Sequence, residues 1–83
     1  MIISDRTDLN TIVDVGFYSV NNPINAPSGY TDWCNVIVLQ AGGNITYPMQ
    51  ILIKHSQGNT PYICIRIATK NVFSDWHTFA PVK

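Results

Sequence analysis

The chain has five aspartates and no glutamate, and a pair of these carboxyl groups could in principle hydrolyse a glycosidic bond. That reaction needs one carboxyl group on each side of the bond, at a defined separation. Asp14, Asp32 and Asp75 are the candidates for such a pair. Asp5 and Asp8 suit a helix start, and Asp32 and Asp75 stand at loop or strand-start positions where aspartate commonly accepts backbone hydrogen bonds. We therefore expect that the chain is not an enzyme, with glycan cleavage as the third-ranked alternative.

The cysteines and histidines show no pattern of a metal site or a nucleophile. Cys34 and Cys64 each lie inside an apolar run, and His55 and His77 have no ligand-like spacing to either cysteine. The sequence also contains no serine-hydrolase, zinc-protease or phosphate-binding glycine motif. We expect two buried, reduced thiols, with a disulfide as the alternative, and no metal or other cofactor.

Aromatic residues beside polar ones are the stronger binding candidates. Tyr30, Asp32 and Trp33 fall within one four-residue stretch of loop. Aromatic rings can stack on a sugar ring while a neighbouring carboxylate accepts hydrogen bonds from the hydroxyl groups. His77, beside Trp76, could add a contact, although a histidine there also suits simple packing at a sheet edge. The predicted ligand-binding residues are Tyr30, Asp32, Trp33 and His77.

The composition indicates one small neutral domain, spanning residues 1–83. Five basic residues balance the five aspartates and are scattered along the chain, so a nucleic-acid partner is not expected. No apolar run is long enough to span a membrane and no signal-peptide pattern starts the sequence, so we expect neither membrane insertion nor an export signal. A chain of 83 residues is near the lower limit for a single core, which favours oligomerisation or attachment to a larger assembly.

The pattern of apolar residues predicts a mainly β (α+β) fold. A two-turn helix is expected near the N-terminus, because Leu9, Ile12 and Val13 share one helical face between a capping residue and Gly16. Strands are predicted at residues 17–20, 34–40, 46–53, 62–68 and 76–79, with an irregular loop over residues 21–32 and turns at residues 42–44, 57–59 and 70–71. The predicted architecture is a small antiparallel β-meander with the short helix packed on one face.

Strand alternation assigns the two faces of this sheet. Ile63, Ile65 and Ile67 point to one side, and their strand neighbours Tyr47, Met49, Ile51 and Ile53 make the matching apolar side. We expect this isoleucine face to be the core, covered by the helix. The other face carries Gln50, Tyr62 and Arg66, a mixture that suits contact with another subunit. These three residues are the predicted oligomer interface.

The order of several short motifs resembles the pyocin knob domains of phage tail fibres and R-type pyocin fibres. The motifs are Asp8-Leu9-Asn10, Gly16-Phe17-Tyr18, Ala26-Pro27-Ser28-Gly29, a Tyr62-Ile63-x-x-Arg66 strand and a closing Ser74-Asp75-Trp76. The family's strand reads Tyr-Ile-x-Arg, with one residue fewer before the arginine. His77 stands where the family often has Arg or Lys.

The resemblance implies a function at the tip of a fibre. Members of the family look like compact modules of trimeric fibres, near the part that meets the bacterial surface. The chain is therefore expected to form a homotrimer, to join the rest of a tail fibre, and to bind a bacterial surface glycan such as lipopolysaccharide or capsule without chemistry. It would be made in the cytoplasm of the host bacterium and reside in a virion or phage-tail-like particle. The alternative is a purely structural knob that caps, spaces or trimerises the fibre.

Overall fold

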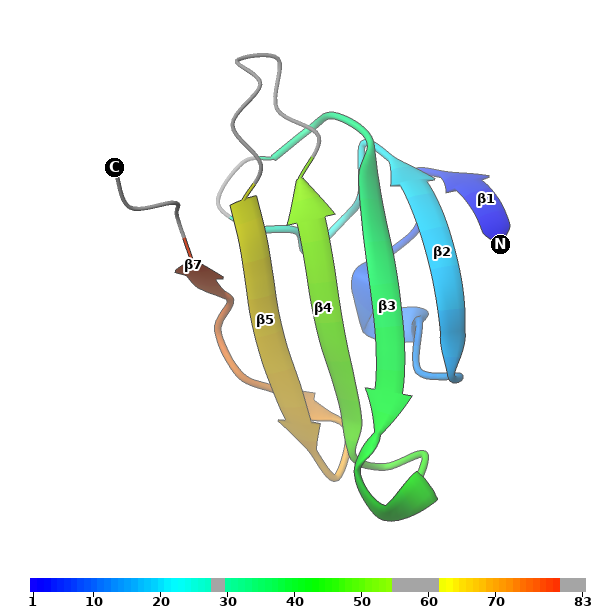
Figure 1. The fold of residues 1–83 in the computed structure, drawn as a ribbon, viewed down its shortest axis with the longest axis vertical. Coiled ribbons are helices and arrows are strands. Elements are labelled where there is room, and N and C mark those ends of the chain that lie inside the picture. Colours follow the sequence, from blue (N-terminus) through cyan, green and yellow to red (C-terminus); the bar gives the residue numbers. More distant parts are fainter. Residues whose placement is uncertain (28–29, 55–61, 80–83) are drawn as a thin grey trace.

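The computed structural model describes residues 1–27, 30–54 and 62–79, in which one twisted β-sheet dominates the fold (Figure 1). The strands follow the order β1-β2-β3-β4-β5, and both β6 and β7 pair with the far edge of β5. Neighbours from β2 onward are antiparallel, whereas β1 runs parallel to β2. The strands are β1 (Ile2–Asp5), β2 (Gly16–Asn21), β3 (Cys34–Gln40), β4 (Pro48–Lys54), β5 (Tyr62–Thr69), β6 (Val72–Phe73) and β7 (His77–Phe79).

This arrangement confirms the predicted mainly β, antiparallel meander. The five predicted strands correspond to β2, β3, β4, β5 and β7, and β7 pairs back onto β5 as expected. The glycine turn after β3 is the 3₁₀ turn η2 (Ala41–Gly43), in which Gly42 and Gly43 take positive φ angles of 61° and 71°. Strands β1 and β6 were not predicted, and the turn predicted at residues 57–59 lies outside the described residues.

The N-terminal helix is much shorter than expected. It is a single 3₁₀ turn, η1 (Leu9–Thr11), whose cap Asp8 accepts a hydrogen bond of 2.9 Å from the backbone N–H of Asn10. Backbone hydrogen bonds from Leu9 to Ile24 and from Ile24 to Thr7 tie this segment to the loop after β2. The Gln50 amide donates to the carbonyls of Leu9 and Ile12, which continued α-helical turns would use as acceptors, and an isolated two-turn helix is too short to compete.

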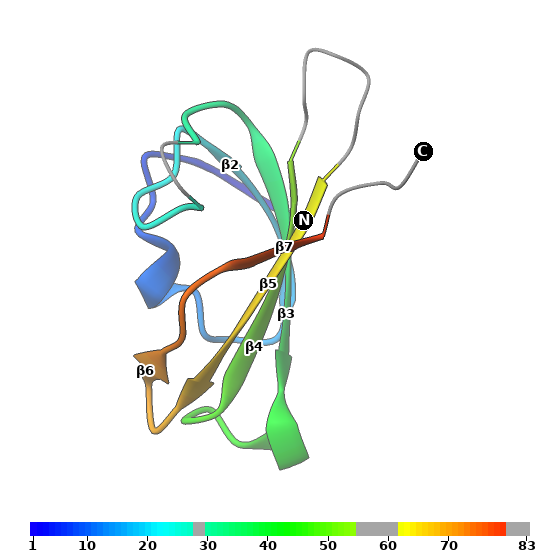
Figure 2. The ribbon, with the colours of Figure 1, turned by 90° about the vertical axis from the view of Figure 1, so that its left-hand side faces the viewer.

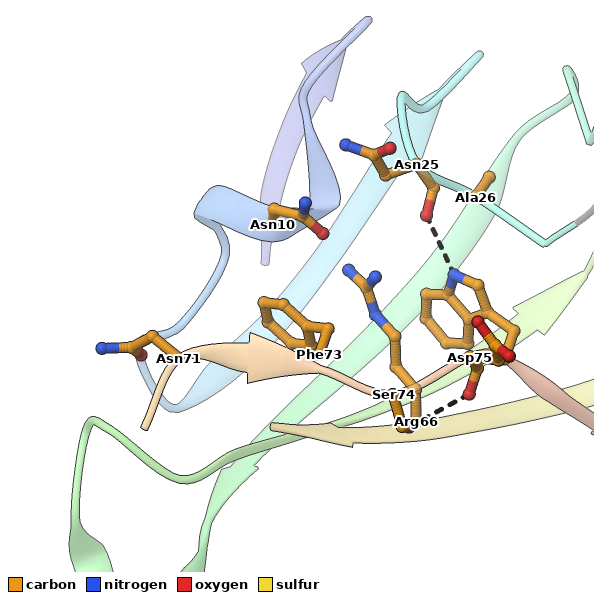
Figure 3. A pocket seen from close by; sticks show the side chains of 9 residues that line it. Asn10, Asn25, Ala26, Arg66, Asn71, Phe73, Ser74 and Asp75 are labelled. Carbon is orange, nitrogen blue, oxygen red and sulfur yellow. Dashed lines mark hydrogen bonds between the residues drawn. The ribbon is translucent and has the colours of Figure 1, made fainter. Parts of the chain in front are cut away.

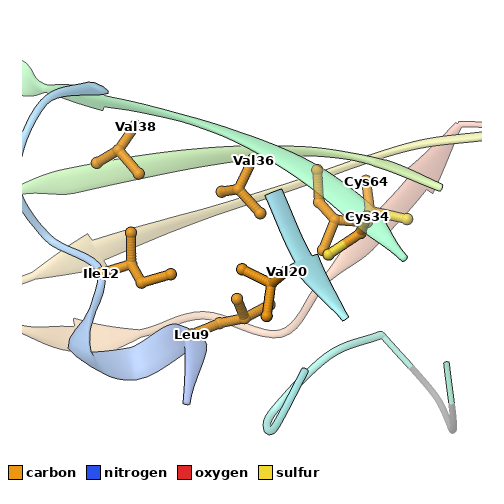
Figure 4. Close-up of a cluster of buried hydrophobic side chains, with 8 residues drawn as sticks. Leu9, Ile12, Val20, Cys34, Val36, Val38 and Cys64 are labelled. Carbon is orange, nitrogen blue, oxygen red and sulfur yellow. The ribbon is translucent and has the colours of Figure 1, made fainter. Parts of the chain in front are cut away.

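One side of the sheet is covered by residues 6–12 and 22–27, which we call the covering layer. Figure 2 shows both segments, together with β6, on the same side of the sheet. Beneath them lies a cluster of buried side chains from η1 and the four central strands (Figure 4). The cluster consists of Leu9, Ile12, Val20, Cys34, Val36, Val38, Leu52 and Cys64.

The face predicted to be the core is the opposite one, so that prediction was wrong. The side chains of Ile63 and Ile67 are 43% and 49% exposed, whereas Cys64 and Arg66 between them are buried. On β4, Gln50 and Leu52 are likewise fully buried. Alternation along the strands was read correctly, but both faces of this sheet are rich in apolar residues. The isoleucine content alone therefore does not predict which face of the sheet the covering layer packs against.

Both cysteines are free thiols and both are buried, as the sequence analysis predicted. Cys34 lies on β3 beside Val20 of β2, and the Cys64 sulfur lies 3.3 Å from the hydroxyl oxygen of Thr78. Burial raises the pKa of Cys34 from its ordinary value of 9.0 to about 11, because the thiolate would lose its hydration.

The raised pKa predicts a loss of stability at alkaline pH. The unfolded chain releases the Cys34 proton near pH 9 while the folded protein still holds it, so the free energy of unfolding should fall as pH rises from 9.0 to about 11. Tyr18 acts in the same direction, because burial and then Asp14 raise its pKa. Urea unfolding at a series of pH values measures the effect.

Cys34→Ala is the matched variant for this measurement. It should cost about 1 kcal/mol at neutral pH through lost packing, and it should lose less stability than the parent above pH 9. Identical pH dependence in parent and variant would contradict the assignment to Cys34.

Candidate functional site

The face of the sheet beneath the covering layer, which we call the inner face, carries one unusual side chain, that of Arg66. It lies in the middle of β5 between the buried residues Cys64 and Ala68, and only 5% of its surface is exposed. Burial lowers the pKa of Arg66 to about 10, and the negative charge of Asp8 acts in the opposite direction. The guanidinium is therefore still protonated at neutral pH, and the fold holds a cation at the boundary between core and covering layer.

Gln50 connects this cation to the covering layer. It lies opposite Arg66 on the neighbouring strand β4, and its side-chain oxygen accepts a 2.8 Å hydrogen bond from Arg66 Nε. Its amide nitrogen donates to the carbonyls of Leu9 and Ile12, at 2.7 and 2.8 Å. Because arginine can only donate, the glutamine oxygen must face Arg66, which leaves its nitrogen for the two carbonyls.

Two aromatic rings enclose the guanidinium. Its central carbon lies 3.9 Å from the ring centroid of Phe73 and 4.5 Å from that of Trp76, within the range of a cation–π contact. The turn at Lys70 and Asn71, both with positive φ, folds β6 back and brings Phe73 to this position. Trp76 is held by a 2.9 Å hydrogen bond from its indole nitrogen to the carbonyl of Asn25.

One end of the guanidinium has no protein partner. The nitrogen Nη2 of Arg66 is buried and makes no hydrogen bond, and within the described residues no carboxylate forms an ion pair with it. The side chain lines a cleft of about 530 Å³. In Figure 3 the guanidinium points toward Asn10 and Asn25 on the covering layer. The full lining consists of Asn10, Asn25, Ala26, Arg66, Asn71, Phe73, Ser74, Asp75 and Trp76.

A buried nitrogen without a protein partner is a position where a water, an ion or a ligand can accept a hydrogen bond. Leaving a buried donor unsatisfied costs about 1 to 3 kcal/mol, and more when the group is charged. Native proteins keep such groups mainly where an ordered water, an ion or a ligand completes them. The geometry of the cleft therefore favours an acceptor group, and best an anionic one, in front of Arg66.

The loop predicted to bind a ligand is a separate local structure. Asp32 accepts a 2.7 Å hydrogen bond from the backbone N–H of Trp33, and the Tyr30 hydroxyl donates to the Trp33 carbonyl. Tyr30 also packs against the core and lies 5.5 Å from the Lys54 ammonium, measured to the ring centroid. It lines a smaller hollow of about 280 Å³. Trp33 is 42% exposed, so the loop does present one aromatic ring to solvent.

His77 does not join that loop. Its cross-strand partner is Ile65 on the face opposite the covering layer, and it lines a hollow of about 260 Å³ with Phe79 and Ile67. The structure therefore brings Tyr30, Asp32 and Trp33 together but places the fourth predicted residue on the other side of the sheet.

The predicted oligomer interface also needs correction. Gln50 and Arg66 are 0% and 5% exposed within a single protomer, covered by its own residues 9–12, so neither is available to a second subunit. Tyr62 is half-buried and lies with its ring centroid 5.7 Å from the Lys54 ammonium. The mixed polarity that suggested a subunit contact is instead explained by hydrogen bonds to the covering layer.

The aspartates are dispersed. Asp75 lines the Arg66 cleft, whereas Asp14 and Asp32 are not among its lining residues. Asp8 caps η1 as expected, and it also accepts a 2.7 Å hydrogen bond from the Asn25 amide. Among the described residues, no three His, Cys, Asp or Glu side chains gather as a metal site. In this part of the chain, no helix has the length and apolarity needed to cross a bilayer.

Most residues of the cleft were not predicted from the sequence. Asn10, Asn25 and Phe73 come from three segments that the sheet topology brings together, and nothing in their local sequence marks them as a set. One signal was present: Arg66 is a single charge between Ile65 and Ile67 in an otherwise apolar strand. A charge in such a place requires compensating partners.

No protein-family model matches this chain, and no curated protein or solved structure matches it either. The resemblance to pyocin knob domains therefore stays a prediction.

The role of Gln50 in holding the covering layer can be tested with Gln50→Leu. The variant keeps a similar volume but removes the Gln50 bonds to Arg66 Nε and to the Leu9 and Ile12 carbonyls, and the Leu9 carbonyl then keeps only its bond from the Ile12 N–H. The free energy of unfolding should therefore fall by about 3 kcal/mol. Gln40→Leu is the matched control, because Gln40 makes one hydrogen bond, to Val13, and should cost about 1 kcal/mol. Denaturant unfolding compares the two, and equal losses would argue against the role.

Proposed function

We propose that this chain is a non-catalytic binding module and that its Arg66 cleft holds the acidic group of a bacterial surface glycan. The observation that carries the proposal is the buried guanidinium nitrogen without a partner, in a cleft large enough for a sugar residue. Its ligand would be an acidic sugar, bound without being changed.

The chemistry of the guanidinium favours a carboxylate or phosphate oxygen. Arginine presents planar N–H donors whose geometry matches these anions, and charge-assisted hydrogen bonds are about twice as strong as neutral ones. Gln50 and the two aromatic rings hold the Arg66 side chain in place before any ligand arrives. A ligand therefore meets a preorganised donor and need not order a flexible side chain.

The rest of the cleft suits the hydroxyl groups of a sugar. The side chains of Asn10 and Asn71 make no hydrogen bond within the described part of the chain and are exposed at the cleft. Amide groups can both donate to and accept from hydroxyl groups. Trp76 and Phe73 add apolar surface against which a sugar ring can pack.

Asp75 adjusts the charge of the cleft without neutralising Arg66. Its side chain is exposed and forms no ion pair with Arg66 in the described structure. A carboxylate there would repel an anionic ligand weakly through solvent, while accepting hydrogen bonds from sugar hydroxyl groups. The site therefore selects a ligand with one acidic group aimed at Arg66, in preference to a highly charged polyanion.

The placement of this module in a phage or phage-like tail fibre rests on the sequence resemblance. A glycan site in a small, stable β-domain is what a receptor-binding fibre tip requires, and lipopolysaccharide or capsule commonly carries acidic sugars. The second candidate is a structural knob that caps, spaces or trimerises the fibre. It is favoured by the large apolar face opposite the covering layer, where Ile63 and Ile67 are exposed.

Titration with D-glucuronate, and with D-glucose as its neutral counterpart, tests the binding proposal. Because Trp76 lines the cleft, its indole N–H signal in NMR spectra reports binding there. Glucuronate should shift this signal and glucose should not. Equal responses to the two sugars, or no response to either, would overturn the proposal.

Two exposed side chains provide variants that leave the fold intact. Asn10→Asp places a negative charge at the cleft and should weaken glucuronate binding about three- to tenfold, whereas Asp75→Asn removes one and should strengthen binding by a similar factor. Trp33→Ala is the control for the predicted loop site and should bind normally. Loss of binding in Trp33→Ala, with no change in Asn10→Asp, would place the ligand at the loop of residues 30–33.

A further inference from the structure

The face of the sheet opposite the covering layer, which we call the outer face, is mostly apolar, although Ser19, Asn35 and His77 also lie on it. A row of side chains crosses its centre from β2 to β7, in the register Phe17, Ile37, Ile51, Ile65 and His77. Three consecutive members of this row are isoleucines, on the three longest strands. Cross-strand pairs of branched side chains give a continuous hydrophobic surface.

The rows on each side extend this surface. On one side Ile53 pairs with Ile63, which pairs with Phe79, and on the other Met49 pairs with Ile67. Phe79, Ile67 and Ile63 are 58%, 49% and 43% exposed. Figure 2 shows no described helix or strand over this face. Exposed apolar patches of this kind often mark an interaction surface.

The outer face also lacks charge. Between β2 and β5, and on β7, none of its outward positions is Lys, Arg or Asp, and the chain contains no Glu. The charged residues of the central strands, Lys54 and Arg66, both belong to the inner face. Two identical outer faces would therefore meet without like-charge repulsion and without burying an ion.

The size of the face matches a specific interface. Five strands spaced by about 4.8 Å, with about six residues each at 3.3 Å, give a flat footprint of about 24 by 20 Å, or roughly 500 Å². Two such faces packed together thus bury about 1,000 Å² in total, and the uneven surface formed by the side chains increases this area. Specific interfaces start near this value, and those between identical subunits are the more apolar ones.

We propose that the outer face packs against another copy of this chain. Two twisted sheets stack face to face at a spacing of about 10 Å, with the side chains of the inner faces interdigitating. The isoleucine rows then become the core of the assembly, as strand alternation had indicated for a core. The contact lies on the opposite side of the sheet from the Arg66 cleft, so binding and self-association are independent.

Sedimentation of the full chain over about a hundredfold range of concentration tests this inference. The protomer has a mass of 9.3 kDa, and the parent should sediment as two or more copies. Ile63→Lys and Ile67→Lys change side chains that are exposed in the protomer, so each should leave the fold intact. Each should raise the dissociation constant at least about tenfold, because a lysine in an apolar interface must lose its hydration.

Ile24→Lys is the matched control, since Ile24 is 38% exposed and lies in the covering layer. It should associate like the parent. A trimeric parent would also support the inference if both outer-face variants sediment as smaller species, because three such faces can meet around a threefold axis. A parent that stays monomeric over the whole range, or variants that keep the parental mass while folded, would overturn it.

Discussion

The hydrogen-bonded chain from Arg66 through Gln50 to the covering layer is the interaction on which the structure depends. The covering layer is irregular, so its backbone makes only a few hydrogen bonds within itself. Gln50 supplies two of its carbonyls with donors from the middle of a buried strand, at Leu9 and Ile12. Arg66 in turn occupies the glutamine oxygen and fixes its orientation. A purely apolar inner face could bury the same area but could not satisfy this backbone.

This arrangement couples the fold to the candidate site. Arg66 must be buried to reach Gln50, and burial of a long, forked cation leaves its far nitrogen where the β-sheet offers no acceptor. The ring faces of Phe73 and Trp76 partly compensate for the lost hydration of the guanidinium. The hydrogen bond from Trp76 to the Asn25 carbonyl connects this aromatic pair to the covering layer. The binding capacity that we propose is thus a consequence of how the layer is attached.

The positions of the strands could be predicted from the sequence, but which face of the sheet is buried could not. Period-two alternation and glycine turns located β3 and β5 almost to the residue, because those signals are local. The predicted two-turn helix did not form because the carbonyls of Leu9 and Ile12, which continued helical turns would use, accept hydrogen bonds from the distant Gln50 side chain. The core was assigned to the wrong face because the choice depended on which side offered polar partners to an irregular cover. The cleft depended on three distant segments, and only the isolated charge of Arg66 hinted at it.

Both faces of the sheet are rich in apolar residues, although only one of them is covered by the described residues of the protomer. A sheet with apolar residues on both faces is typical of a strand layer that is buried on both sides, which a single short covering layer cannot achieve. The inner face is covered within the protomer because Gln50, held by Arg66, donates hydrogen bonds to backbone carbonyls of the covering layer. The isoleucine face is mostly apolar, and its polar side chains Asn35 and His77 are exposed, so it suits another apolar surface better than an irregular cover. The division of polar residues between the two faces therefore separates the face that the chain covers by itself from the face that we propose packs against a second copy.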